Sequence, residues 1–140
     1  DTMNAFVYDA VNNGVYKVGF ATKQEVYQEE VRRLFKALDK LEALLAQQDF
    51  LIGNRLTEAD IRLFTSLVRF DSVYFGHFKC NIRQLSDYPH LWAYTKGIYH
   101  LPGIQETVNF EHIKEHYYGS HKTINPNGIV PLGPEIDWTV

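Results

Sequence analysis

The segment Leu56-Thr57-Glu58-Ala59-Asp60-Ile61 has the pattern of a helix start. Thr57 and Asp60 have the spacing of a helix N-cap and its third helical position, so each side chain can accept a hydrogen bond from the other residue's backbone N–H group in a capping box. Leu56 and Ile61 occupy the positions of a hydrophobic staple, which sets the angle at which the chain joins the helix. We therefore predict that Thr57 and Asp60 are structural N-cap residues and that removing the cap costs about 0.5–2 kcal/mol.

The helix that follows is predicted to reach about Val73 and is apolar on most of its circumference, which is typical of a buried central helix. A longer helix is predicted from Thr22 to near Gln48, because Thr22 and Glu25 also have capping-box spacing and apolar residues recur every three or four positions. The apolar stripe of this longer helix consists of Tyr27, Val31, Leu34, Leu38, Leu41 and Leu45.

Helices with the same periodicity are predicted over residues 3–11, 89–99 and 110–120. The first is expected to end at Asn12-Asn13-Gly14, because Asn and Gly tolerate the left-handed conformation found at helix ends. Residues 15–20 are then expected to form a loop, and residues 104–108 a short turn. We predict an all-α chain with a helical body over residues 1–121 and an extended tail over residues 122–140, where Pro and Gly are too dense for regular structure.

Composition excludes several classes of protein. The chain has 140 residues and a net charge of −3, so it fits one domain and lacks the positive charge of a general nucleic-acid or membrane-surface binder. No apolar run is long enough to cross a membrane, and the first residues lack the pattern of a signal peptide. With Cys80 as its single cysteine the chain can form no internal disulfide, which suits a reducing compartment such as the cytoplasm.

The order of these motifs resembles the C-terminal helical domain of the glutathione transferase superfamily. A long amphipathic helix, then Phe50-Leu51-Ile52-Gly53, then the capping box before a buried helix, is the hallmark of that domain. Four blocks are similar to segments characteristic of one subgroup, the glutathionyl-hydroquinone reductases of the xi class, which are related to the omega class. These blocks are residues 12–22, 69–81, 108–114 together with 116–118, and 124–131.

The resemblance implies an enzyme that uses glutathione as co-substrate. In that family a cysteine thiolate attacks the sulfur of a glutathionyl-hydroquinone and releases the hydroquinone, and a second glutathione resolves the mixed disulfide. The cysteine belongs to a Cys-Pro motif in a preceding thioredoxin-like domain, and the family is typically dimeric. This sequence has no Cys-Pro motif, so we expect a piece of a longer homodimeric enzyme without the nucleophile. The alternative is a non-catalytic helical module that serves protein assembly.

Three tyrosines are the candidate substrate-binding residues. The resemblance places Tyr16 near the catalytic thiol, within hydrogen-bonding reach of a quinol oxygen. It also places Tyr117 at the acceptor site. Tyr118 is a further candidate, although neighbouring residues on a helix point about 100° apart, so Tyr118 is the better suited of the pair to packing. The alternative for each tyrosine is a purely structural ring and hydroxyl.

Two other groups could carry chemistry but have plainer explanations. His112 and His116 are four residues apart on one helix face, with His121 beyond them, yet no third acidic or thiol ligand has suitable spacing, so no metal site is predicted. Cys80 has Lys79 and Arg83 nearby, which would favour a thiolate, but no Pro follows it and apolar residues flank it. We expect Cys80 to be inert.

Overall fold

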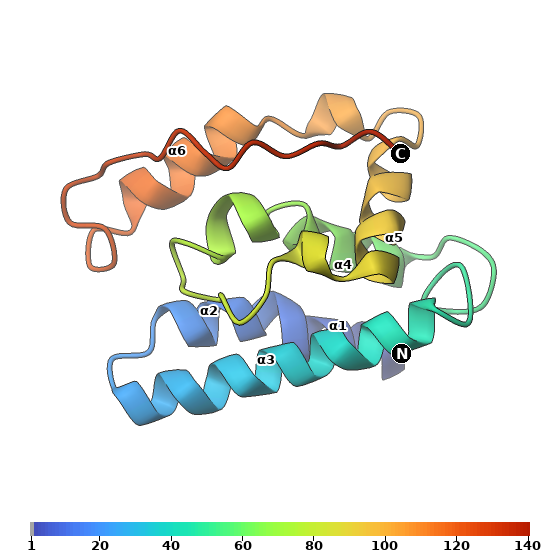
Figure 1. Ribbon diagram of the computed structural model, residues 1–140, viewed down its shortest axis with the longest axis horizontal. Helices are drawn as coiled ribbons and strands as arrows, with labels where there is room; N and C mark the ends of the chain where they lie inside the picture. The colour runs from blue at the N-terminus through green and yellow to red at the C-terminus, as the bar shows by residue number, and fades with distance from the viewer. Residues whose placement is uncertain (1) are drawn as a thin grey trace.

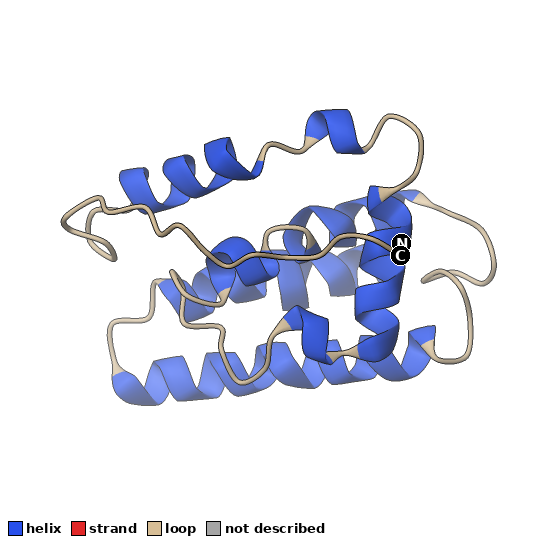
Figure 2. Cartoon of the chain, turned by 45° about the horizontal axis from the view of Figure 1, so that its top comes forward, coloured by secondary structure: helices blue, strands red, loops and turns tan. Residues whose placement is uncertain are grey.

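The computed structural model describes residues 2–140, and the ribbon is built of helices and short helical turns (Figure 1). Residues 2–140 contain no β-strand, and no helix among them is both long and apolar enough to cross a bilayer (Figure 2). The all-α prediction is therefore confirmed. The helices are α1 (Thr2–Val7), α2 (Asn13–Gly19), α3 (Gln24–Leu45), α4 (Glu58–Leu67), α5 (Pro89–Tyr99) and α6 (Phe110–Ser120). The shorter turns are η1 (Tyr8–Asn12), η2 (Phe70–Tyr74), η3 (Leu85–Asp87) and η4 (Gln105–Thr107).

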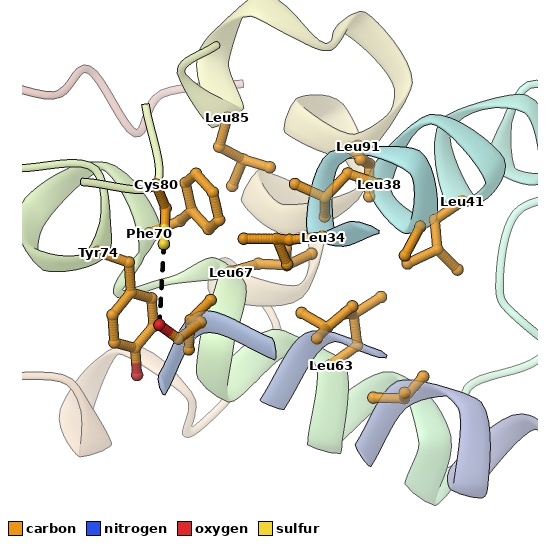
Figure 3. Close-up of a cluster of buried hydrophobic side chains, with 14 of the residues drawn as sticks. Leu34, Leu38, Leu41, Leu63, Leu67, Phe70, Tyr74, Cys80, Leu85 and Leu91 are labelled. Carbon is orange, nitrogen blue, oxygen red and sulfur yellow. Dashed lines mark hydrogen bonds between the residues drawn. The ribbon is translucent and has the colours of Figure 1, made fainter. Parts of the chain in front are cut away.

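The core lies where α3 meets α2, α4 and α5. The predicted apolar stripe of α3 is buried from Val31 to Leu45, and only Tyr27 at its start is partly exposed. Leu63 and Leu67 of α4 face this stripe in the close-up of the core (Figure 3). Because the stripe repeats every three or four residues, one side of a long helix can be buried along its whole length.

The prediction that the first helix ends at Asn12-Asn13-Gly14 is wrong. Residues 2–19 are helical throughout, with the π-helical turn η1 between α1 and α2, so the expected loop over residues 15–20 is mostly α2. The Asn12 amide donates to Ser66 Oγ at 2.6 Å, which ties η1 to α4. Gly14 is buried, and a Cβ there would lie 3.4 Å from Leu34 of α3. Asn12 thus bonds to α4 and Gly14 lies buried against α3, and neither residue forms a turn.

The capping box predicted at Thr22 and Glu25 is also wrong. α3 begins at Gln24, with Lys23 at the N-cap position and no side-chain cap. The first hydrogen bond of the helix runs from the Tyr27 N–H to the Lys23 carbonyl at 3.0 Å, so Thr22 belongs to the connection before the helix. This connection joins α2 to α3, and the two helices pack against each other.

The capping box at α4 is confirmed. The Thr57 N–H donates to Oδ2 of Asp60 at 2.8 Å. Asp60 does more than cap the helix, because its Oδ1 accepts from the Leu51 N–H at 3.0 Å and from the Tyr94 hydroxyl at 2.7 Å. The Asp60 side chain, fully buried, therefore joins the start of α4 to the preceding loop and to α5.

The last residues of the chain follow α6 back along the body without forming a helix (Figure 1). Lys114 of α6 donates to the carbonyls of Pro131 and Leu132, both at 2.9 Å. Trp138 then packs against Trp92 of α5 and Phe110 of α6, at ring-centroid distances of 4.9 and 5.4 Å. These contacts attach the tail to α5 and α6 of its own chain.

Candidate acceptor-binding site

Three tyrosine hydroxyls from three separate elements meet at one point. The hydroxyl of Tyr117 on α6 lies 2.8 Å from that of Tyr16 on α2 and 3.0 Å from that of Tyr74 on η2. Tyr74 and Tyr117 are buried, whereas Tyr16 is 38% exposed. The cluster of Tyr16, Tyr74 and Tyr117, called here the tyrosine triad, thus extends from the protein interior to the surface.

Each hydroxyl has one proton to donate, and the triad contains two internal hydrogen bonds. Two of the three protons are used in these bonds, so one remains available to a partner outside the triad. The exposed end of the triad is Tyr16, where an incoming oxygen could accept that proton.

Their surroundings keep the hydroxyls of Tyr16 and Tyr74 in the neutral form. Burial, followed by the hydrogen bond with Tyr117, raises the pKa of Tyr16 to about 12. Burial and the same neighbour raise the pKa of Tyr74 well above its ordinary value. At neutral pH these phenols are therefore hydrogen-bond donors and not phenolates.

The Phe78 ring packs against two rings of the triad. Its ring lies 5.2 Å from that of Tyr16 and 5.4 Å from that of Tyr74, measured between centroids. Phe78 itself is buried against Gly19, the last residue of α2, where an added Cβ would lie 2.3 Å from the Phe78 ring. Gly19 therefore allows Phe78 to hold the triad in place.

An open pocket of about 450 Å³ lies beside the triad. Its volume falls in the range of small-molecule sites, roughly 300–1,000 Å³. η1, α4 and Arg69 supply the remainder of the lining, which is mixed in polarity. The lining residues are Tyr8, Asn12, Tyr16, Ile61, Arg62, Thr65, Ser66, Arg69, Tyr74 and Tyr117.

The other predicted site residues lie outside the triad. The Tyr118 ring packs against that of His77 at 4.5 Å between centroids, so Tyr118 occupies a different face of α6 from Tyr117. His121 shares a hydrogen bond with His77, Nδ1 to Nε2, at 3.1 Å. Among residues 2–140 no three His, Cys, Asp or Glu side chains gather as metal ligands would.

Cys80 is buried in the core, where its thiol lies 3.9 Å from the Val15 carbonyl (Figure 3). Burial raises the pKa of this thiol far above its ordinary value. A buried thiol that stays protonated is a poor nucleophile, in keeping with its predicted inertness.

A family model for the glutathione S-transferase C-terminal domain matches residues 24–97, from the first residue of α3 into α5. The chain belongs to this family. It is 58% identical over 134 residues to glutathionyl-hydroquinone reductase YqjG of Escherichia coli (strain K12), a match that covers 96% of this chain and 41% of the relative. The predicted membership of the glutathione transferase superfamily is confirmed.

Solved structures agree with the family assignment. The glutathione-bound structure of YqjG from Escherichia coli K-12 superposes with a TM-score of 0.96 and 57% identity, covering 99% of this chain and 45% of that one. The xi class glutathione transferase from Natrialba magadii gives a TM-score of 0.97 and 48% identity, covering 100% and 44%. The glutathione transferase domain described here thus spans less than half the length of the relatives it matches.

Of the ten residues that line the pocket, only Tyr16 and Tyr117 are predicted from the sequence, and Tyr74 and Arg69 matter most among the others. Tyr74 completes the triad and Arg69 lines the pocket. Both lie inside the block of residues 69–81 that resembles the reductase subgroup, but no periodicity marks them, because η2 is a single turn. That block was the one signal that could have singled them out.

Substitution of Gly19 by alanine is expected to destabilise the protein by about 1–3 kcal/mol, because the new methyl group must displace the buried Phe78 ring. Urea unfolding of the wild type and the variant measures the loss. Gly97→Ala is the matched control, since Gly97 also lies within a helix but has open space where its Cβ would be. Gly97→Ala should increase the free energy of unfolding by about 0.5–1 kcal/mol. Equal effects at both positions would contradict the role assigned to Gly19.

The His77–His121 pair predicts a loss of stability in acid. Burial, the neighbouring His121 and Lys79 together lower the pKa of His77 from 6.5 to about 4. Between these pH values the unfolded chain binds more protons than the folded one, so stability falls as pH drops from 6.5 towards 4. The slope attributable to one such group is at most about 1.4 kcal/mol per pH unit.

Urea unfolding at intervals between pH 4 and 7 tests this assignment. The free energy of unfolding of His77→Gln should depend less on pH than that of the wild type. Subtracting one pH profile from the other cancels the contribution of the carboxylates, which the two proteins share. Parallel pH profiles for the two proteins would show that His77 is not the group responsible.

Proposed function

We propose that this chain forms the acceptor-binding part of a glutathione-dependent reductase that removes glutathione from glutathionyl-hydroquinones. The observation that carries the proposal is the tyrosine triad, three linked hydroxyls at the wall of an open pocket. The glutathionyl-hydroquinone reductase YqjG is similar along almost the whole of this chain. The nucleophilic cysteine would come from an N-terminal thioredoxin-like domain outside the chain.

The reaction would proceed in two thiol steps. The cysteine thiolate attacks the glutathione sulfur, a sulfur–sulfur bond forms, and the bond between that sulfur and the ring carbon breaks. The released electron pair passes to the ring, where charge is shared with the ring oxygens and a proton is taken up. A second glutathione then attacks the mixed disulfide, so that glutathione is oxidised to its disulfide while the conjugate is reduced to free hydroquinone.

The triad would stabilise the charge that develops on a ring oxygen. With Tyr74 donating to Tyr117 and Tyr117 donating to Tyr16, the free proton lies on Tyr16 and can be donated into the pocket. Linked hydrogen bonds polarise one another, which strengthens the terminal donor. A donor fixed in advance beside developing negative charge is a large source of rate enhancement in other enzymes. In this proposal Tyr16 and Tyr117 contact or support the acceptor as predicted, and Tyr118 is a further candidate.

Turnover of a defined conjugate tests the proposal. The full-length polypeptide that carries this chain is incubated with glutathionyl-1,4-hydroquinone and glutathione, and free hydroquinone and glutathione disulfide are measured. Equal amounts of the two products are expected. Absence of both products, together with no change in tyrosine fluorescence on adding the conjugate, would favour the non-catalytic assembly module.

The proposal includes a homodimer in the cytoplasm. The dimer is supported by the family resemblance, since that family is typically dimeric. The cytoplasm is supported by the single, free thiol of Cys80, which suits a reducing compartment. Light scattering on the full-length polypeptide measures the assembly state, and a monomeric mass would remove the dimer from the proposal.

A further inference from the structure

Arg69 brings a positive charge to the pocket beside the tyrosine triad. It lies between α4 and η2, and its side chain is partly buried. Its Nη1 donates to the Thr65 carbonyl at 2.6 Å, which holds the guanidinium against the end of α4. Arg69 lines the same 450 Å³ pocket as all three triad tyrosines.

The charge of Arg69 is not neutralised within the part of the chain that the structure describes. No carboxylate among residues 2–140 forms an ion pair with it. The other charged residue of the lining is Arg62, which is paired with Glu58 on its own helix, and no Asp or Glu lines the pocket. The pocket therefore carries a net positive charge centred on Arg69.

The positive charge of Arg69 also acts on the hydroxyls of the tyrosine triad. The positive field of Arg69 acts to lower the pKa of Tyr16 and of Tyr74, against the stronger effect of burial. A ligand that places a ring oxygen on the exposed end of the triad would thus lie within the influence of the guanidinium.

We propose that Arg69 makes this pocket selective for aromatic acceptors that carry an anionic substituent, such as a ring carboxylate. The triad would bind a ring oxygen, and the unpaired nitrogens of the guanidinium would bind the carboxylate. Guanidinium and carboxylate groups have matching planar geometry and can form two parallel hydrogen bonds. This inference rests on the proposed function and narrows its substrate class.

A series of substrates of different charge is the first test. The full-length polypeptide is assayed with the glutathione conjugates of 1,4-hydroquinone, of 2,5-dihydroxybenzoate and of an aminomethyl hydroquinone. We expect kcat/KM for the carboxylate to exceed that for the neutral ring roughly 10- to 100-fold, the value of a hydrogen bond to a charged group. The cationic conjugate should be the poorest substrate, and the preference should weaken as salt is added.

Variants of Arg69 are the second test. Arg69→Gln should lower kcat/KM for the carboxylated conjugate about 10- to 100-fold more than for the neutral one, which removes the preference, and Arg69→Lys should keep part of the preference. Arg33→Gln is the matched control for loss of one positive charge, since Arg33 is exposed on α3 and pairs with Glu29. It should leave the preference unchanged.

The outcomes separate the inference from the proposed function. Turnover of all three conjugates at equal kcat/KM would overturn the inference and leave the proposed function standing. Equal losses on the neutral and carboxylated conjugates in Arg69→Gln would also overturn it, because they would assign Arg69 to the shared glutathione portion. No turnover of any conjugate would overturn the proposed function itself. Should Arg69→Gln fail to fold, the charge series and its salt dependence on the wild type decide the matter.

Discussion

Replacing Asp60 with alanine is expected to destabilise the protein by about 3–5 kcal/mol. The carboxylate is fully buried and accepts hydrogen bonds from the backbone of Thr57 and Leu51 and from the hydroxyl of Tyr94. Without it these donors stay buried and unpaired, and each costs about 1–3 kcal/mol. Urea unfolding of wild type and variant at pH 7 measures the difference in the free energy of unfolding.

Two variants at residues that contact Asp60 show which lost interaction accounts for the destabilisation. Tyr94→Phe removes one donor together with its need for an acceptor, so its effect should be much smaller than that of Asp60→Ala. Thr57→Ala removes the cap side chain alone and should cost about 0.5–2 kcal/mol. A loss in Asp60→Ala no larger than that in Thr57→Ala would mean that Asp60 is only a helix cap.

Tyr16→Phe is expected to lower kcat/KM for a glutathionyl-hydroquinone about 100- to 1,000-fold, the range seen when a preorganised donor to a developing oxyanion is removed. The effect should fall mainly on kcat, because the charge develops only as the bond to sulfur breaks. Steady-state kinetics of the full-length polypeptide measure it, with product quantified as free hydroquinone. Folding should change little, since the Tyr16 side chain is 38% exposed.

Tyr118→Phe is the comparison that locates the effect. Tyr118 is next to Tyr117 in sequence but packs on His77, away from the triad hydroxyls. If the triad carries the chemistry, Tyr118→Phe should lower kcat/KM far less than Tyr16→Phe. A larger loss in Tyr118→Phe would assign the acceptor to the other face of α6.

The pH dependence of turnover adds a further check on the phenols. Because the pKa of Tyr16 is raised to about 12, this residue should remain a donor throughout the physiological range. Its raised pKa also contributes stability that is complete below pH 10 and is lost as pH rises towards 12. A tyrosine that titrates near neutral pH in the free protein would contradict the environment described for the triad.

Local pattern was enough to predict most of the helices. α4 begins where its capping box predicts, α5 and α6 cover the ranges that periodicity predicts, and the stripe of α3 is buried as its spacing requires. These signals act between residues three or four positions apart, so the sequence contains both partners of each interaction. The start of α3 was predicted wrongly, because Thr22 and Glu25 have capping-box spacing but Thr22 lies in the connection between α2 and α3.

The helical class, the α4 capping box and the family resemblance follow from the amino-acid sequence, because each depends on residues close together in the chain or on whole motifs. Three features emerge only from the folded chain: Asn12 bonds to α4, Tyr74 completes the triad, and Arg69 lines the pocket with no ion-pair partner among residues 2–140. These features depend on residues that are far apart in the sequence. The hydroxyls of Tyr16 and Tyr117 are 101 positions apart, and only the packing of α2, η2 and α6 brings them within 2.8 Å.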